Sequence, residues 1–116
     1  MSVKKKLVFV CAQNRIRSCS AERLFNAKFS ETLSSRSVGT DDNAVVKISE
    51  RHLMWADIVF VMEQKHKKII LKRFPKYAET KQIIVLGLED IYDPDEPELL
   101  NELERRVMPH LANTIN

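Results

Sequence analysis

Residues 11–18 bring a cysteine, two arginines and a serine together in one short stretch, Cys-Ala-Gln-Asn-Arg-Ile-Arg-Ser. The stretch lies between an apolar run and a helical pattern, so we expect a strand–loop–helix turn. In such a turn, backbone N–H groups and the helix N-terminus point at one centre and favour negative charge. The same field favours the thiolate of Cys11, which is its nucleophilic form. Arg17 adds a planar fork that matches two phosphate oxygens, and the Ser18 hydroxyl is placed to donate to the thiolate. The sequence therefore predicts an anion site that contains a nucleophile.

The elements that position this loop are a strand before it and a helix after it. Residues 7–10, Leu-Val-Phe-Val, predict a short buried strand. After Ser20, apolar residues recur at helical spacing, which predicts a helix that fades near Ser30. The apolar positions are Ala21, Leu24, Phe25 and Phe29. Cys11 stands at the end of the strand, where a small buried apolar role is the alternative to a nucleophilic one.

Strand and helix patterns alternate along the rest of the chain. Further strands are predicted at 34–38, 58–62 and 83–86. Helices are predicted from Ser49 to about Trp55 and over a stretch that contains His66 and is stopped by Pro75. A last helix is predicted with Pro97 in its first turn and Asp95 or Glu96 as its cap. This alternation predicts one domain over residues 1–116, a three-layer α/β/α fold with a four-stranded parallel sheet and right-handed crossovers. Ligands bind such sheets beyond the carboxyl ends of the strands, where the loops at Cys11 and Asp90 emerge.

Composition sets bounds on the class of protein. The 116 residues are 44% hydrophobic and 30% charged, with a formal net charge of +3, which is ordinary for a globular domain. No run approaches the ~20 apolar residues of a membrane span, and two cysteines fit a reducing compartment, so we expect a cytoplasmic protein without membrane contact. The three histidines and two cysteines lack metal-ligand spacing, and we expect no metal or other cofactor.

The stretch from Cys11 to Cys19 resembles the phosphate-binding loop of the low-molecular-weight protein tyrosine phosphatases, whose pattern is Cys-x-Gly-Asn-x-Cys-Arg-Ser-Pro. Four residues match: Cys11, Asn14, Arg17 and Ser18. Three depart from the pattern: Gln13, Ile16 and Cys19. Asn14 also makes sense on physical grounds, because asparagine accepts a positive φ and the loop must curl tightly.

The resemblance implies a phosphate monoester hydrolase that acts like a protein tyrosine phosphatase through a phosphocysteine intermediate, with Cys11 as nucleophile and Arg17 as phosphate ligand. Its implied partners are phosphorylated substrates, either a phosphotyrosine protein or a small aryl phosphate, and no nucleic acid. The implied phosphate-binding residues are Ala12, Gln13, Asn14, Arg15, Ile16, Arg17 and Ser18. No aromatic residue lies between Thr40 and Leu53, so a phenyl ring has less to stack on there.

A thiol-dependent phosphatase also needs an acid to protonate the leaving group. Residues 88–92, Leu-Glu-Asp-Ile-Tyr, resemble the family's Asp-Pro-Tyr segment, which implies that Asp90 is the general acid. Asp93, followed by Pro94, offers a competing register. The alternative is a solvated acidic loop that precedes the last helix.

Two further residues are implied to support the loop. Residues 37–40, Ser-Val-Gly-Thr, resemble the family's Ser-Ala-Gly-Thr, which implies that Ser37 hydrogen-bonds Asn14; a plain polar turn is the alternative. His66 is either a satisfied core histidine or, by the resemblance, part of the Asn14 network.

Other functions remain open from the sequence. An arsenate reductase would need cysteines after Cys19 to resolve its intermediate, and a sugar-transport phosphocysteine carrier would not need Arg17. A nucleic-acid-binding module would use the cations of the third helix, which we expect to form a solvated face. Those cations are Lys65, Lys67, Lys68, Lys72 and Arg73. A phosphate-binding regulator without turnover is the last alternative.

Overall fold

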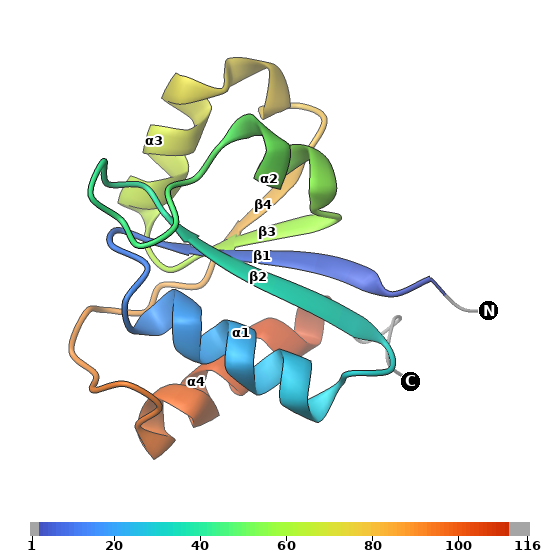
Figure 1. The fold of residues 1–116 in the computed structure, drawn as a ribbon, viewed down its shortest axis with the longest axis vertical. Coiled ribbons are helices and arrows are strands. Elements are labelled where there is room, and N and C mark those ends of the chain that lie inside the picture. Colours follow the sequence, from blue (N-terminus) through green and yellow to red (C-terminus); the bar gives the residue numbers. More distant parts are fainter. Residues whose placement is uncertain (1–2, 112–116) are drawn as a thin grey trace.

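A parallel sheet of four strands organises the protein in the computed structural model, which describes residues 3–111 (Figure 1). The strands are β1 (Lys5–Cys11), β2 (Leu33–Gly39), β3 (Ile58–Val61) and β4 (Gln82–Val85). They lie in the order β2-β1-β3-β4, and every neighbouring pair is parallel. The predicted α/β class and four-stranded parallel sheet are therefore confirmed.

Helices cover both faces of this sheet. The four helices are α1 (Arg17–Lys28), α2 (Glu50–Trp55), α3 (Gln64–Arg73) and α4 (Pro97–Val107). Figure 1 shows α1 and α4 on one face and α2 and α3 on the other. Short 3₁₀ turns, Pro75–Tyr77 and Met108–His110, follow α3 and α4, and each contains a proline that cannot continue a helix. In residues 3–111, every helix is too short or too polar to span a bilayer.

The first helix begins at Arg17, earlier than its apolar pattern indicates. Its first turn is polar and yet buried. Ser18 and Ser20 are both inaccessible to solvent, and the hydroxyl group of each forms a hydrogen bond outside the helix. Ser18 contacts Cys11, and Ser20 accepts a hydrogen bond from the backbone of Asp95. Hydrophobic periodicity cannot reveal a turn whose buried face is made of hydroxyl groups.

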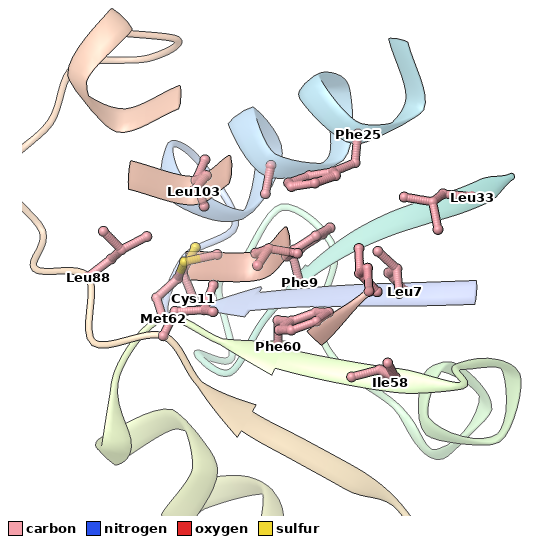
Figure 2. Close-up of a cluster of buried hydrophobic side chains, with 14 of the residues drawn as sticks. Leu7, Phe9, Cys11, Phe25, Leu33, Ile58, Phe60, Met62, Leu88 and Leu103 are labelled. Carbon is pink, nitrogen blue, oxygen red and sulfur yellow. The ribbon is translucent and has the colours of Figure 1, made fainter. Parts of the chain in front are cut away.

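Side chains of β1 alternate between the two helical layers, as the pleat of a strand requires. Leu7, Phe9 and Cys11 belong to one buried cluster, which also contains residues of α1 and α4, whereas Val8 and Val10 belong to the other. Figure 2 shows the first cluster, with Cys11 at the end of β1. Cys11 thus lies where the packed core meets the carboxyl edge of the sheet.

The loops that follow β1 and β4 emerge at that same edge, drawn in blue and orange in Figure 1. The chain leaves β1 for β2 on one side, and the later strand β3 pairs with β1 on the other side. In parallel sheets, such a reversal of strand order opens a crevice between the loops and marks the usual ligand site.

Candidate active site

Cys11 is the last residue of β1 and is only 3% exposed. Its sulfur nevertheless has polar neighbours. The backbone N–H of Asn14 donates to Sγ at 3.2 Å, and Ser18 Oγ lies 3.0 Å from Sγ. Donors of this kind stabilise a thiolate. A purely structural buried cysteine would need none of these contacts and would not line a pocket, as Cys11 does.

Asn14 gives the loop its tight curl. Its φ is 57°, in the left-handed region that the sequence predicted for this residue, and it is 2% exposed. Its side-chain Nδ2 donates to Ser18 Oγ at 2.9 Å, and its Oδ1 accepts a hydrogen bond from Val46 N at 3.2 Å. One side chain therefore ties the loop to α1 and to the segment after β2.

The predicted hydrogen bond between Ser37 and Asn14 is wrong. Ser37 Oγ donates to Glu22 Oε1 at 3.0 Å and lies 3.9 Å from Cys19 Sγ. Cys19 in turn donates from Sγ to the carbonyl oxygen of Asn14 at 3.0 Å. The thiol of Cys19 therefore takes the contact with Asn14 that was expected of Ser37.

Arg17, the first residue of α1, is 3% exposed, and its guanidinium is held along one edge. Nη1 donates to the carbonyl oxygen of Leu88 at 2.6 Å and to Glu63 Oε2 at 2.7 Å. A buried charge needs such partners to offset its lost hydration. Both hydrogen bonds use Nη1, which leaves Nη2 and Nε, the latter 3.8 Å from Asp90 Oδ1, on the side of the guanidinium where an anion could bind.

Glu63 is a site residue that the sequence analysis missed. It is the N-cap of α3, two residues after the end of β3, and the hydrogen bond from Arg17 lowers the pKa of its carboxyl group. Glu63 lies just beyond the carboxyl end of β3, which pairs with β1, and this position could have indicated that it belongs to the site.

His66 supports Glu63, and within residues 3–111 it makes no hydrogen bond to Asn14, contrary to the competing prediction. It is fully buried, and its Nδ1 accepts a hydrogen bond from the backbone N–H of Glu63 at 3.0 Å. Burial and, next, the charge of Arg17 lower the pKa of His66 to about 4. Neutral His66 therefore helps to fix the turn from which Glu63 reaches Arg17.

Gly39 is a second position that the sequence analysis did not single out for the loop. A Cβ atom there would lie 2.5 Å from the carbonyl oxygen of Ala12 and 3.0 Å from the backbone N of Asn14. Only glycine lets the end of β2 approach the loop this closely. The backbone contacts from this segment, including Thr40 N to Cys11 O at 3.0 Å, fix the loop from its outer side.

Asp90, and not Asp93, lies at the pocket. Asp90 Oδ1 is 3.8 Å from Arg17 Nε, and the side chain is 69% exposed. Asp93 belongs to the turn that leads into α4, where its backbone N–H donates to Glu96 Oε2 at 3.0 Å. The geometry therefore favours the Asp90 register for an acid that faces a bound group.

These residues surround a pocket of about 170 Å³. It is lined by Cys11, Ala12, Gln13, Arg15, Ile16, Arg17 and Asp90. The structure thus brings together the predicted nucleophile, phosphate ligand and acid, together with most of the predicted loop. Asn14 and Ser18 are buried and hold the loop in shape, whereas Ser37 and His66 lie outside the lining.

The cations of the third helix form a separate feature. Lys65, Lys68, Lys72 and Arg73 are exposed on α3, and Lys67 is partly so. Lys65 Nζ lies 3.7 Å from Glu63 Oε2, near the buried ion pair. The arrangement is that of a solvated helix face, as predicted. Within residues 3–111, no group of three or more metal-ligating side chains gathers.

No protein-family model matches the sequence, and no curated protein matches it either. Solved structures do match along almost the whole chain. A low-molecular-weight protein tyrosine phosphatase from T. tengcongensis matches with a TM-score of 0.74 and 24% identity, covering 95% of this chain and 99% of that one. The chain has the low-molecular-weight phosphatase fold.

Two further neighbours share this phosphatase fold. SP-PTP, a low-molecular-weight protein tyrosine phosphatase from Streptococcus pyogenes, matches with a TM-score of 0.76 and 18% identity, covering 97% of this chain and 94% of that one. The YwlE arginine phosphatase from Geobacillus stearothermophilus matches with a TM-score of 0.67 and 20% identity, covering 94% and 96%. The phosphatase fold thus covers nearly the whole chain, and the proteins that share it are named for two different phosphorylated residues, tyrosine and arginine.

Proposed function

We propose that this protein hydrolyses phosphate monoesters through a phosphocysteine intermediate on Cys11. One observation carries the proposal. Cys11 Sγ, with hydrogen-bond partners at 3.0 and 3.2 Å, lines the same pocket as Arg17 and Asp90. A nucleophile, an anion ligand and an acid are the three groups that the reaction requires. The names of the structural neighbours support the same chemistry.

The first step transfers the phosphoryl group to the enzyme. The Cys11 thiolate attacks phosphorus, the bond from phosphorus to the ester oxygen breaks, and a sulfur–phosphorus bond forms. The electron pair leaves with the ester oxygen, which takes a proton from the Asp90 carboxyl group. The free edge of Arg17 and the loop N–H groups stabilise the charge on the other phosphate oxygens.

The second step releases phosphate. Asp90, now a carboxylate, accepts a proton from water while the water oxygen attacks phosphorus. The sulfur–phosphorus bond breaks, and Cys11 returns as a thiolate that Ser18 and the Asn14 N–H stabilise. The products are inorganic phosphate and the regenerated enzyme with Asp90 protonated.

We propose a phosphotyrosine protein or a small aryl phosphate as the substrate class. Asp90 supports this proposal because it lines the pocket and is 69% exposed, so that an acid there would be within reach of a leaving oxygen. The loop residues Ala12, Gln13, Arg15 and Ile16 line the wall on which the phosphate would rest.

Hydrolysis of p-nitrophenyl phosphate by matched variants tests this function. Cys11→Ser should release no phosphate above background. Asp90→Asn should slow phenyl phosphate, a poor leaving group, by about 10²–10³-fold, and p-nitrophenyl phosphate much less, because a good leaving group needs little protonation.

Asp93→Asn is the control for loss of an acidic residue from the same segment, and it should retain the wild-type rates. Full turnover by Cys11→Ser would refute the mechanism. Tight phosphate binding by the wild type without any phosphate release would instead identify a phosphate-binding regulator.

A further inference from the structure

Arg15 is the pocket's exposed cation. It lines the same pocket as Cys11, it is exposed to solvent, and within residues 3–111 it has no carboxylate oxygen within 4 Å. Arg17, two residues on, is buried and paired with Glu63. Residues 11–18 therefore hold two guanidinium groups with different surroundings. That of Arg17 is buried and ion-paired, and that of Arg15 is exposed to solvent.

The rest of the pocket wall has little to offer an aromatic leaving group. Of the described residues that line it, none is aromatic. Stacking on a ring is the usual way to recognise an aryl group, and charge recognition is the other means of discrimination at a polar mouth. A free arginine supplies a planar set of N–H donors that matches a carboxylate or a second phosphate.

We infer that Arg15 selects substrates that carry a second negative group beside the phosphate, as an acidic residue flanking phosphotyrosine does. The inference rests on the proposed function of the site and adds the class of substrate. Arg15 does not take part in the bond-making steps. It is a specificity-determining residue, because it would contact the part of the substrate next to the ester.

The charges around the pocket limit where this second group can lie. The exposed Glu89, next to Asp90 in the chain, brings negative charge to the side formed by the loop after β4. Glu63 is already bound to Arg17. An acidic group on the substrate would be repelled from the Asp90 side and attracted to the Arg15 side, so the two walls together would orient the substrate.

A pair of phosphotyrosine peptides tests this inference. The peptides are identical except that glutamate or glutamine flanks the phosphotyrosine. The wild type should favour the glutamate peptide by up to about fivefold in kcat/KM, the upper end of the range for one solvent-exposed ion pair. In Arg15→Gln the ratio should fall to about one, and Arg15→Lys should restore part of it. Because each ratio is taken on one variant, a general loss of activity cancels.

Arg51→Gln is the matched control, since it removes one exposed arginine from α2, outside the pocket lining. It should keep the wild-type ratio. Equal use of both peptides by the wild type, or a ratio that survives in Arg15→Gln, would overturn the inference.

Binding separates this inference from the proposed function. With Cys11→Ser as the background, dissociation constants of the two peptides, measured by fluorescence anisotropy, should show the same preference and the same dependence on Arg15. If the wild type shows no turnover but the Cys11→Ser protein binds the glutamate peptide more tightly through Arg15, the proposed hydrolase is refuted and the inference about Arg15 stands. Equal dissociation constants would overturn it.

Discussion

The two loops that meet at the pocket differ in how firmly the fold holds them. In the loop after β1, Cys11, Asn14, Arg17 and Ser18 are all buried, and hydrogen bonds connect each of them to another part of the site. The loop after β4 is held at its two ends and open between them. Asp90 in that open part is 69% exposed.

The ends of the second loop show where it is fixed. Leu88 is 1% exposed, and its carbonyl oxygen accepts the hydrogen bond from Arg17. Asp95 has a φ of 56°, donates from its backbone to Ser20 Oγ at 3.0 Å, and pairs with Arg23. The fold therefore holds the proposed nucleophile and anion ligand by hydrogen bonds, and it leaves the proposed acid in an exposed segment.

Among the substitutions that test this difference between the loops, Arg17→Lys should have the largest effect, a loss of activity. Lysine has no planar fork, so it cannot keep both Leu88 and Glu63 as partners and still present two donors to a phosphate. We expect kcat/KM for p-nitrophenyl phosphate to fall by about 10²–10³-fold, as for loss of one charge-stabilising donor. Thermal unfolding of the same variant is the control for folding. Wild-type activity in Arg17→Lys would mean that the buried guanidinium is only structural.

The buried His66 should make the free energy of unfolding sensitive to acid. The folded protein holds the pKa of His66 at about 4, whereas the ordinary value is 6.5. Between about pH 4 and pH 6.5, the unfolded chain therefore binds a proton at His66 more readily than the folded protein does. The contribution of His66 to the free energy of unfolding should be constant above about pH 6.5 and should fall as the pH drops towards 4. Between pH 7 and pH 5 the loss should be about 2 kcal/mol.

Urea unfolding of His66→Gln should show a correspondingly smaller fall between these pH values. His52, whose pKa burial also lowers, should contribute equally in the wild type and the variant. His110→Gln, at an exposed site, is the control and should follow the wild-type curve. An unchanged slope in His66→Gln would show that this histidine is not held neutral by the fold.

Ile91→Ser should have the smallest effect, because it lies in the open part of the second loop. Ile91 is 69% exposed next to Asp90. Replacing a side chain that buries little area should change the free energy of unfolding by less than about 0.5 kcal/mol. A loss well above 1 kcal/mol, measured by urea unfolding, would show that the second loop is as firmly held as the first.

Much of the fold was predictable because its signals are local. The apolar runs at 7–10 and 58–62 gave two central strands, and the weak run at 34–38 proved to be a strand too. The contacts that complete the site are not local. Glu63 reaches Arg17 across 46 residues, and Gly39 meets the loop through its missing Cβ, which no spacing rule reports.

The site residues divide in the same way. Cys11 and Arg17 share one short stretch, so their spacing could indicate their common pocket. Asp90 was proposed from the resemblance of residues 88–92, just after the last strand, to the family's Asp-Pro-Tyr segment. Ser37 was misassigned because its hydroxyl group donates to Glu22, and the thiol of Cys19 contacts the carbonyl oxygen of Asn14. Side-chain partners of this kind are visible only in three dimensions.

The central claim is that a phosphoryl group passes through the sulfur of Cys11. Rapid acid quench of the enzyme during turnover of p-nitrophenyl phosphate, followed by peptide mass mapping, tests this claim most directly. We predict a peptide that contains Cys11 and carries the mass of one phosphoryl group, with the largest amount in Asp90→Asn if release of phosphate then limits the rate. Turnover without any phosphorylated Cys11, or with the group on another residue, would contradict the mechanism.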